Sequence, residues 1–454
     1  MTQPPQRLRI AVIQTAGVPL HAWRATMAAV GELAERAAED ADLVLLPECA
    51  WPAYWLGSWD DYRDSRAAGM PSADDFLDLL AAIASRRRVH VCAGYVAEED
   101  GQLFNRAAII DPQGEILGTY DKTFLWSFDR NWFTPGREIR PIQTTFGPVG
   151  LLICADARIP EIAATLVARG ARLLLQPTAW VNGGRPDHLW NPQPDFLVPT
   201  RARECGVPMA SASKCGSEGD TTFVGSSLIC DAHGRKLAVC DANRPGVAVA
   251  EVALADPRPR RRILRRWRLG PDFTRPPHFE QTARLSVARL RPAVEGAPAA
   301  EHASGGTLLC RVAMRSAQDA PSTGEISHDI ELYGPTESVV GCGRLRLAAI
   351  AARHTHHFAL ARSLALQGIH LLIVFGRARP QSLRARAAEN RIFVVAVSDA
   401  PQAYDPRGLP IDGHASLGDD ELLGLTFDPG QAVSKEVAPG TDVFAGRRVD
   451  LYEF

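Results

Sequence analysis

Three residues of the 454-residue chain, Glu48, Lys122 and Cys154, have side chains that together could form and break a covalent bond to carbon. A thiol needs a base to become a nucleophilic thiolate, and the carboxylate of Glu48 could supply it. An ammonium group such as that of Lys122 favours the thiolate and stabilises the oxyanion formed when the thiolate attacks a carbonyl. Taken singly, the three have ordinary structural interpretations: a glutamate at a strand end, a solvated lysine and a small core cysteine. Their combination points to nucleophilic catalysis.

The elements that must position these residues follow from the apolar patterning. Predicted strands cover residues 8–14, 43–46, 89–95, 106–111, 115–120, 149–153, 173–176, 207–212 and 223–231, and predicted helices cover 22–39, 76–87 and 161–169. Strands alternating with helices and then hairpins indicate a layered α/β fold with antiparallel parts. Glu48 and Cys154 come directly after predicted strands, where α/β proteins tend to place ligands.

Composition excludes several classes of function. The formal net charge is −2, so no overall field attracts nucleic acid or an anionic membrane. An arginine-rich stretch at residues 256–275 is better interpreted as an exposed extension than as a nucleic-acid patch. The chain shows neither a signal peptide nor an apolar run of membrane-spanning length, which predicts a cytoplasmic protein. Nine cysteines without a C-x-x-C pair fit neither a disulfide framework nor a zinc site.

Five motifs occur in a fixed order: LLPE at 45–48, FNRAAIIDPQGEILGTYDK at 104–122, FTPG at 133–136, GLLICADARIPE at 150–161 and RARECGVPM at 201–209. In these motifs the chain resembles the nitrilase superfamily of carbon–nitrogen hydrolases over roughly residues 7–280. The resemblance implies a four-layer αββα sandwich and a catalytic triad of Glu48, Lys122 and Cys154. It also implies that the backbone N–H of Ala155 joins Lys122 in holding the oxyanion, and that no metal or organic cofactor is needed.

Residues around the triad bear on the substrate. Many members of the superfamily have a second glutamate where this chain has Asp129, which is either a shorter carboxylate of the site or an ordinary structural aspartate. The residues from Cys154 to Arg158 resemble the Cys-x-Asp-x-Arg of amide and carbamoyl hydrolases more than the Cys-Trp-Glu of nitrile-cleaving relatives. Asp156 and Arg158 are expected to form an ion pair, with substrate contact as the alternative. The small Ala155 would enlarge the pocket.

Aromatic residues crowd the same motifs. We expect Trp51, Tyr54, Trp126 and Trp180 to line the substrate pocket, where they would hold an apolar or aromatic acyl group. The alternative is that these rings pack in the core.

The tail resembles part of the first domain. RARECGVPMASAS at 201–213 returns as RAAENRIFVVAVS at 386–398, and LVARGARLLL at 166–175 as LALQGIHLLI at 364–373. We therefore predict a hydrolase domain at 1–285, a linker at 286–306 and a partial repeat at 307–454. The repeat has an alanine, Ala351 or Ala352, where Cys154 would stand, so it should be non-catalytic. It could cover the helix at 161–169 as an internal pseudo-partner, in place of the homodimer contact usual in the superfamily.

The sequence thus predicts an α/β protein, an αββα sandwich followed by a smaller α/β half-repeat. Its predicted activity is hydrolysis of a small-molecule amide or N-carbamoyl compound through a thioester, with release of ammonia or an amine. Two alternatives stay open: a nitrilase that forms a thioimidate from a nitrile, and a non-catalytic scaffold.

Overall fold

The computed structural model describes residues 6–184, 188–254, 345–398, 401–411 and 429–452, and six short strands at 285–287, 290–292, 308–314, 330–332, 339–342 and 425–427. The chain divides into two compact units. The first comprises residues 1–261 and takes up the chain again at 446–454, and the second comprises 262–445. The arginine-rich stretch at 256–275 lies outside the described residues, as does nearly all of the predicted linker.

Eight strands form the first sheet of the first unit, in the order β11-β10-β1-β2-β3-β4-β5, with β14 also paired to β1. Their bounds are β1 Gln6–Gly17, β2 Leu43–Leu45, β3 His90–Glu99, β4 Gln102–Ile110, β5 Ile116–Asp121, β10 Lys214–Glu218, β11 Thr221–Val224 and β14 Gly246–Leu254. The central strands β1, β2 and β3 are parallel, and β2 is buried throughout. An unbroken apolar run is what a strand covered on both faces requires.

Six strands form the second sheet, in the order β13-β12-β9-β8-β7-β6. Their bounds are β6 Ile142–Thr144, β7 Gly147–Leu151, β8 Leu173–Pro177, β9 Met209–Ala212, β12 Leu228–Cys230 and β13 Lys236–Val239. The strands β7, β8 and β9 are parallel to one another, whereas β6 and β12 run antiparallel at either side of them. The two sheets pack face to face, with β1 against β9 and β3 against β8.

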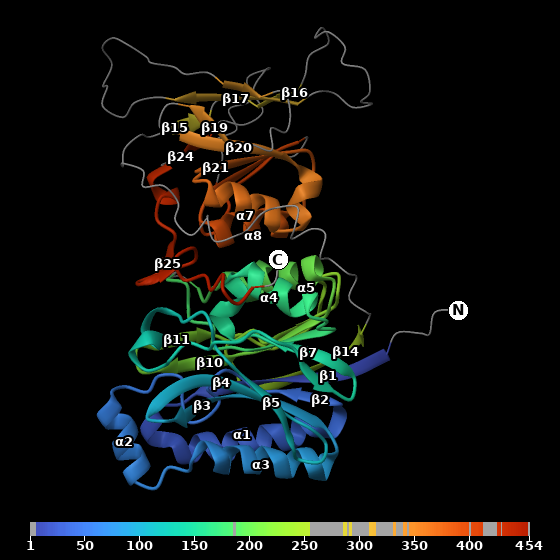
Figure 1. The fold of residues 1–454 in the computed structure, drawn as a ribbon, viewed down its shortest axis with the longest axis vertical. Coiled ribbons are helices and arrows are strands. Elements are labelled where there is room, and N and C mark those ends of the chain that lie inside the picture. The colour runs from blue at the N-terminus through green and yellow to red at the C-terminus, as the bar shows by residue number, and fades with distance from the viewer. Residues whose placement is uncertain are drawn as a thin grey trace. The chain divides into compact units, whose positions relative to one another are not determined.

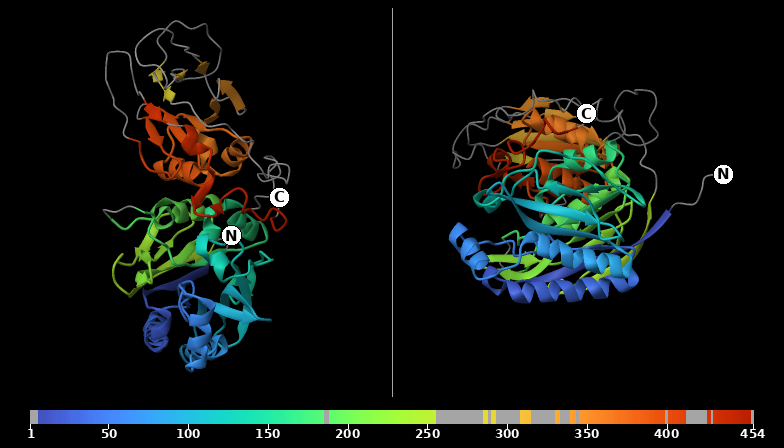
Figure 2. Two further views of the ribbon diagram at one scale, coloured as in Figure 1. Left: turned by 90° about the vertical axis from the view of Figure 1, so that its left-hand side faces the viewer. Right: turned by 60° about the horizontal axis from the view of Figure 1, so that its bottom comes forward.

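Helices cover both outer faces of this pair of sheets. The helices α1 Trp23–Ala37 and α3 Ala73–Arg87 cover the first sheet, and α4 Pro160–Ala168 and α5 Val198–Cys205 cover the second, while α2 Trp59–Ala67 lies near α3 (Figures 1 and 2). The buried residues of α1 recur at helical spacing, so one face of the helix meets the sheet. This is the αββα sandwich expected from the sequence. No helix in the described ranges is both long and apolar enough to cross a membrane.

The second unit contains a sheet with the order β19-β20-β21-β22-β23. The strands are β19 Val339–Cys342, β20 Leu345–Ala351, β21 Leu371–Phe375, β22 Phe393–Val397 and β23 Gln402–Tyr404, and the helices are η7 Ala352–His356, α7 Ala359–Leu366 and α8 Pro380–Asn390. A further sheet joins β15 Leu285–Val287, β16 Leu290–Pro292, β17 Leu308–Met314, β18 Ile330–Leu332 and β24 Leu425–Phe427, and β25 Glu436–Ala438 pairs with β26 Thr441–Asp442.

The sheet from β19 to β23 repeats the pairing pattern of β6, β7, β8, β9 and β12. In both sheets three parallel strands lie between two antiparallel ones. In both, the first parallel strand is followed by a short 3-10 helix and an α-helix, and the second by another α-helix.

Candidate active site

Cys154 stands at a tight turn between the second sheet and helix α4. It is the first residue of the 3-10 helix η4 Cys154–Arg158, which starts three residues after β7 ends. Its φ of 42° lies in the left-handed region that side chains other than glycine rarely adopt. Strain of this kind persists only where the surroundings enforce it, and it is common at active sites.

Asp156 enforces this turn. Its carboxylate accepts hydrogen bonds from the backbone N–H of Ile153, the backbone N–H of Phe124 and the hydroxyl of Tyr120, each at 2.8 Å. These donors come from both sides of the turn, so Asp156 ties the cysteine loop to the segment after Lys122. The guanidinium of Arg158 lies over the ring of Trp126 with its centre 4.8 Å from the ring centroid. Asp156 therefore stabilises the turn, in place of the expected ion pair with Arg158.

The thiol of Cys154 is buried and protonated at rest. Its Sγ lies 3.9 Å from the carbonyl oxygen of Ala179 and 4.0 Å from Nε2 of Gln193. Burial raises the pKa of the thiol to about 12, and the negative charge of Glu48 adds to this, whereas Lys122 lowers it by a smaller amount. Desolvation therefore outweighs the effect of the Lys122 cation on the thiol. A nucleophilic role would require a base to remove this proton.

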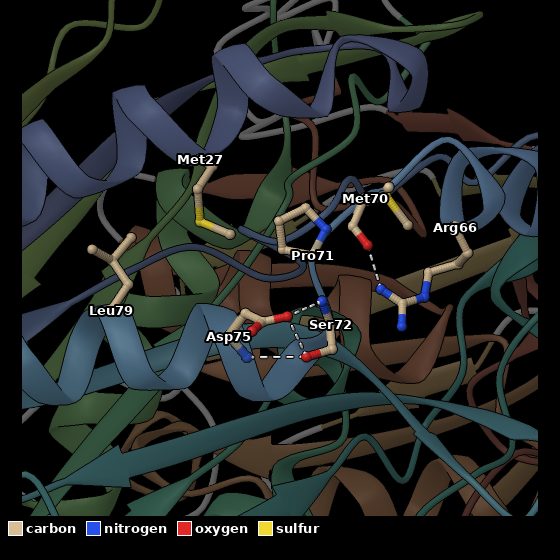
Figure 3. Close-up of a pocket in the computed structure, with 8 residues that line it drawn as sticks. Met27, Arg66, Met70, Pro71, Ser72, Asp75 and Leu79 are labelled. Atoms are coloured by element: carbon tan, nitrogen blue, oxygen red, sulfur yellow. Dashed lines mark hydrogen bonds between the residues drawn. The ribbon is translucent and has the colours of Figure 1, made fainter.

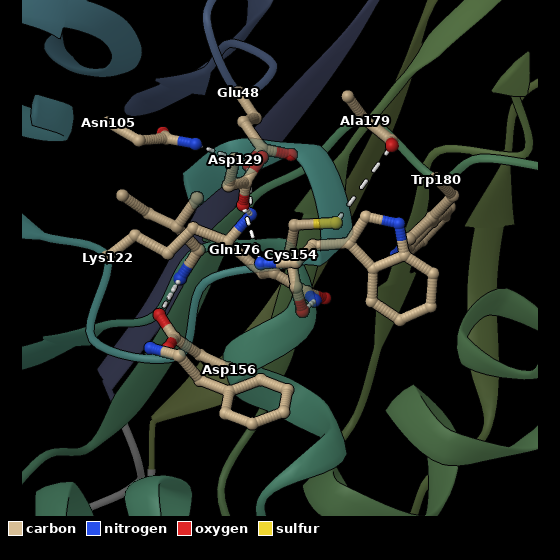
Figure 4. Close-up of polar contacts among 12 residues, drawn as sticks. Glu48, Asn105, Lys122, Asp129, Cys154, Asp156, Gln176, Ala179 and Trp180 are labelled. Atoms are coloured by element: carbon tan, nitrogen blue, oxygen red, sulfur yellow. Dashed lines mark hydrogen bonds and ion pairs between the residues drawn. The ribbon is translucent and has the colours of Figure 1, made fainter. Parts of the chain in front are cut away.

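Glu48 follows strand β2 and is completely buried. Its Oε1 accepts hydrogen bonds from Nδ2 of Asn105 and from Nζ of Lys122, each at 2.7 Å (Figure 4). Burial raises the pKa of Glu48, although Lys122 pulls it down. The second oxygen, Oε2, has no hydrogen-bond partner among the described residues. A carboxylate with one oxygen held and the other open, with its pKa raised, is suited to accept a proton near neutral pH.

Lys122 lies between two carboxylates. Its Nζ is 2.7 Å from Oε1 of Glu48 and 2.6 Å from Oδ2 of Asp129, and all three side chains are fully buried. Burial alone would lower the pKa of Lys122, but Asp129 and Glu48 together raise it well above its ordinary value. The amine therefore stays a cation over the physiological pH range and provides a fixed positive charge beside the thiol.

Asp129 reaches Lys122 despite its short side chain. It lies in the 3-10 helix η3 Ser127–Asn131, and its Oδ2 also accepts a hydrogen bond from the backbone N–H of Trp126 at 2.8 Å. The tight turn brings the backbone close to the lysine, which makes up for the missing methylene. Two interpretations of Asp129 were open, a carboxylate of the site or an ordinary structural aspartate. The structure places it beside Lys122 and Glu48 and not on the surface.

A small pocket lies at the thiol of Cys154. It is lined by Tyr54, Trp126, Cys154, Arg158, Ala179, Val181, Asn191 and Gln193. The free volume is about 10 Å³, roughly the space of one water molecule. Trp126 and Val181 are the partly exposed members of the lining, so they stand at its mouth.

The predicted pocket residues divide into two groups. Tyr54 and Trp126 line the pocket as expected. Trp51 does not, because its ring is buried in the core between Trp23, at a centroid distance of 6.4 Å, and Phe76, at 6.0 Å. Its apolar area is thus used to hold helices α1 and α3 to the first sheet.

Ala155 and Trp180 lie next to the pocket but are not part of its lining. Ala155 is buried within η4, immediately after Cys154. Trp180 is buried beside Ala179, and its backbone N–H donates to Oγ of Ser213 at 3.3 Å (Figure 4). Their side chains therefore pack behind the pocket wall.

Sequence analysis missed three polar residues of the site. Asn105 stood within the quoted FNR motif, and a polar residue in an apolar strand was the signal that could have identified it. Asn191 and Gln193 follow strand β8 in an irregular segment, where Gln193 accepts a hydrogen bond from Gln176 at 2.9 Å and Asn191 donates to the carbonyl of Val181 at 2.7 Å. Nothing in their local pattern distinguished these two from ordinary loop residues.

A larger surface hollow lies elsewhere, beside α1 and α3 (Figure 3). It has a volume of about 590 Å³ and is lined by Met27, Arg66, Gly69, Met70, Pro71, Ser72, Asp75 and Leu79. Its polar groups already have structural partners, since Ser72 and Asp75 cap helix α3 and Arg66 donates to the carbonyl of Met70. It therefore offers none of the chemistry found around Cys154.

The chain is similar to known hydrolases. The model of the carbon–nitrogen hydrolase family matches residues 9–262. A nitrilase of Pyrococcus abyssi is 30% identical over 222 residues, which are 48% of this chain and 80% of that protein. An omega-amidase of Danio rerio is 28% identical over 194 residues, 40% of this chain and 66% of that protein. Among solved structures, an amidase from Nesterenkonia sp. aligns with 28% identity and a TM-score of 0.46, over 56% of this chain and 92% of that chain.

Proposed function

Because the chain belongs to the carbon–nitrogen hydrolase family, we propose that it is a cysteine-dependent hydrolase of a small amide or N-carbamoyl compound. The observation that carries the proposal is the buried set of Glu48, Lys122 and Asp129 beside the thiol of Cys154. Burying three charged side chains costs several kcal/mol per ion unless they are paired, so such a set is rarely kept for stability alone.

The first half of the reaction forms a thioester. Glu48, through its open Oε2, takes the proton of the thiol as Sγ attacks the substrate carbon. The carbonyl π electrons move to oxygen, and the resulting oxyanion is held by the cation of Lys122 and the backbone N–H of Ala155. When the tetrahedral intermediate collapses, the C–N bond breaks and Glu48 returns the proton to the leaving nitrogen. Ammonia or an amine departs, and the acyl group stays on Sγ.

The second half releases the acid. Glu48 takes a proton from a water molecule, and the water oxygen attacks the thioester carbon. The C–S bond then breaks, and the thiolate recovers its proton from Glu48. Asp129 contributes by keeping Lys122 charged and in place, since it shares the ammonium with Glu48. No step in this sequence needs a group beyond the side chains named and water.

The family also contains enzymes that act on nitriles, and two of the relatives are named nitrilases. A nitrile would form a thioimidate at Cys154 with the same base and the same lysine. We favour the amide because the Cys-x-Asp-x-Arg order of Cys154 to Arg158 resembles amide and carbamoyl hydrolases. A non-catalytic scaffold is the remaining alternative, and the intact arrangement of Glu48, Lys122 and Cys154 argues against it.

The test is release of ammonia or amine from a panel of amides, N-carbamoyl compounds and nitriles, beginning with the smallest compounds because the pocket is small. Cys154→Ala is the negative control, and Cys49→Ala, which removes another buried thiol, is the matched control. Release that disappears only in Cys154→Ala supports the proposal, and the class that responds separates amidase from nitrilase. If the folded protein turns over none of these compounds, the result favours the non-catalytic scaffold.

We also propose that the second unit is a degenerate, non-catalytic copy of the second half of the hydrolase domain. Its support is the shared order of strands and helices, together with Ala352 at the first position of η7, where η4 has Cys154. In this proposal the half-copy acts as an internal partner in place of a second chain. Light scattering tests it, since a monomer is expected and a stable homodimer argues against it.

The proposed site of action is the cytoplasm. The seven cysteines whose side chains the structure describes form no disulfide with one another, which fits a reducing compartment. Localisation by fractionation of the source cells would test this.

A further inference from the structure

The last described residues, 446–452, fold with the hydrolase unit although the whole second unit precedes them in the sequence. We refer to residues 446–452 as the C-terminal arm. The chain thus leaves the hydrolase unit after β14 and returns to it through the arm, which runs beside helix α4 (Figure 1). The arm makes two contacts with the hydrolase unit. One is with helix α4, which follows the turn at Cys154, and the other is with the loop at Gly136, which follows Lys122 and Asp129.

The first contact is a buried ion pair between Arg447 and Glu161. The distance from Nε to Oε1 is 3.0 Å, and only 1% of each side chain is exposed. Glu161 is in the first turn of α4, and only the extended residue Ile159 separates α4 from η4, the helix that begins with Cys154. Arg447 of the arm thus supplies a counter-charge to the buried carboxylate of Glu161, which follows the turn at Cys154.

The second contact joins Arg448 to the loop after Asp129. Arg448 donates to the carbonyl oxygen of Gly136 at 3.1 Å, and the backbone N–H of Gly136 donates to the carbonyl of Lys122 at 2.8 Å. A Cβ on Gly136 would lie 2.1 Å from the backbone oxygen of Asp121, so this loop fits directly against the end of the strand that carries the lysine. Movement of Gly136 would therefore move Lys122.

The arm is ordered by its own contacts. Arg448 pairs with Asp450 at 2.8 Å, and its backbone N–H donates to the hydroxyl of Tyr452 at 3.0 Å. Arg447 and Arg448 are adjacent, so one short ordered turn holds both contacts at a fixed separation.

We infer that the C-terminal arm is a positioning element of the active site. Arg447 and Arg448 hold the turn at Cys154 and the loop at Gly136 in fixed positions relative to each other. This inference rests on the proposed function. The attack needs Sγ, Glu48 and Lys122 in one arrangement, and a displacement of about 1 Å can cost about a hundredfold in rate. Arg447 touches no reacting atom and acts through Glu161.

The test uses the full chain and compares Arg447→Met, Glu161→Gln and the double variant Glu161→Gln/Arg447→Met. Each single variant breaks the buried pair between Arg447 and Glu161 and will lose stability. The double variant removes both charges of the pair, so its unfolding temperature is expected to lie closer to that of the wild type. If the arm positions the site, its kcat stays reduced by about ten- to a hundredfold with KM nearly unchanged. Arg407→Met, which removes an exposed arginine paired with Asp405, is the matched control.

Two further measurements make the outcome decisive. Arg448→Gln changes a side chain that is 30% exposed, which the fold should tolerate, and we expect about a threefold fall in kcat. Alkylation of Cys154 by iodoacetamide across pH reports the position of the thiol without any substrate, and should change in both the double variant and Arg448→Gln. Wild-type kcat and alkylation in these variants would overturn the inference. A wild-type protein inactive on all amides but with an arm-dependent alkylation profile would overturn the proposed function alone.

Discussion

The ammonium group of Lys122 donates to Oε1 of Glu48 over 2.7 Å, and both side chains are fully buried. This contact holds one oxygen of the carboxylate and leaves Oε2 open. The same lysine is bound to Asp129 on its other side. One cation thus serves two carboxylates, and the group as a whole carries an excess of negative charge when all three are ionised. Burial is the main reason why the pKa of the neighbouring thiol is raised, and the negative charge of Glu48 adds to it.

Replacing Lys122 by methionine should affect both stability and turnover. Glu48 and Asp129 would stay buried without their counter-charge, so the free energy of unfolding should fall by about 3–5 kcal/mol. Turnover should fall by about 10²–10³-fold, because the oxyanion loses its cation. Urea denaturation and ammonia release measure the two effects, with the exposed Lys236→Met as control. Turnover close to wild type in folded Lys122→Met would contradict the role given to the lysine.

Glu48→Gln should change turnover and thiol ionisation in opposite directions. Glutamine can still accept from Lys122 and Asn105, but it cannot take a proton, so turnover should fall by about 10²–10⁴-fold. The negative charge that helps to raise the pKa of Cys154 is removed as well, and Lys122 is left to favour the thiolate. The pKa of the thiol should therefore drop below its value of about 12.

Ultraviolet absorbance of the thiolate as a function of pH measures that pKa, after subtraction of the same protein with Cys154→Ser. Glu115→Gln, on an exposed turn, is the control. An unchanged thiol titration would show that Glu48 does not act on Cys154 electrostatically.

Asn105→Leu should move the acid limb of activity to higher pH. Burial raises the pKa of Glu48, and the hydrogen bond from Asn105 opposes this rise. Without that bond the pKa of Glu48 should rise further. Since Glu48 must be ionised to accept a proton, kcat/KM is lost as the pH falls through this pKa. The profile of kcat/KM against pH measures the shift, and Asn243→Ser, in an exposed turn, should leave it in place.

The raised pKa of Glu48 also affects the stability of the fold, and at neutral pH this effect is unfavourable. A buried carboxyl whose pKa is raised on folding favours the folded state fully below its ordinary value of 4.5, and this contribution disappears as the pH rises through the raised pKa. Glu48 therefore opposes folding at the pH where it is needed for catalysis. Glu48→Gln should accordingly be at least as stable as wild type at neutral pH, and thermal unfolding against pH would show it.

The sequence predicted the elements around the triad because apolar periodicity and strand-end positions are local features. It correctly predicted an αββα sandwich, and its motif order located Glu48, Lys122 and Cys154 on three different elements that the fold brings together. It could not give the raised pKa of the thiol, because desolvation depends on the neighbours that surround Cys154 in three dimensions. The contact between Arg447 and Glu161 joins residues far apart in the chain, so no local pattern could indicate it. Trp51 was misplaced for a related reason: proximity to Glu48 in sequence does not determine which side of the sheet a side chain faces.

The two tryptophans Trp51 and Trp126 provide a last prediction, because the same substitution should act differently at each. Trp51→Phe leaves a gap in the core beside Trp23 and Phe76, and we expect the free energy of unfolding to fall by about 1–3 kcal/mol with kcat/KM within about twofold of wild type. Trp126→Phe changes the mouth of the pocket and the ring beneath Arg158, so stability should stay within about 0.5 kcal/mol while KM changes for bulkier amides. Denaturation and a series of amides of increasing acyl length measure both quantities. A KM change in Trp51→Phe as large as that in Trp126→Phe would mean that the core ring also shapes the pocket.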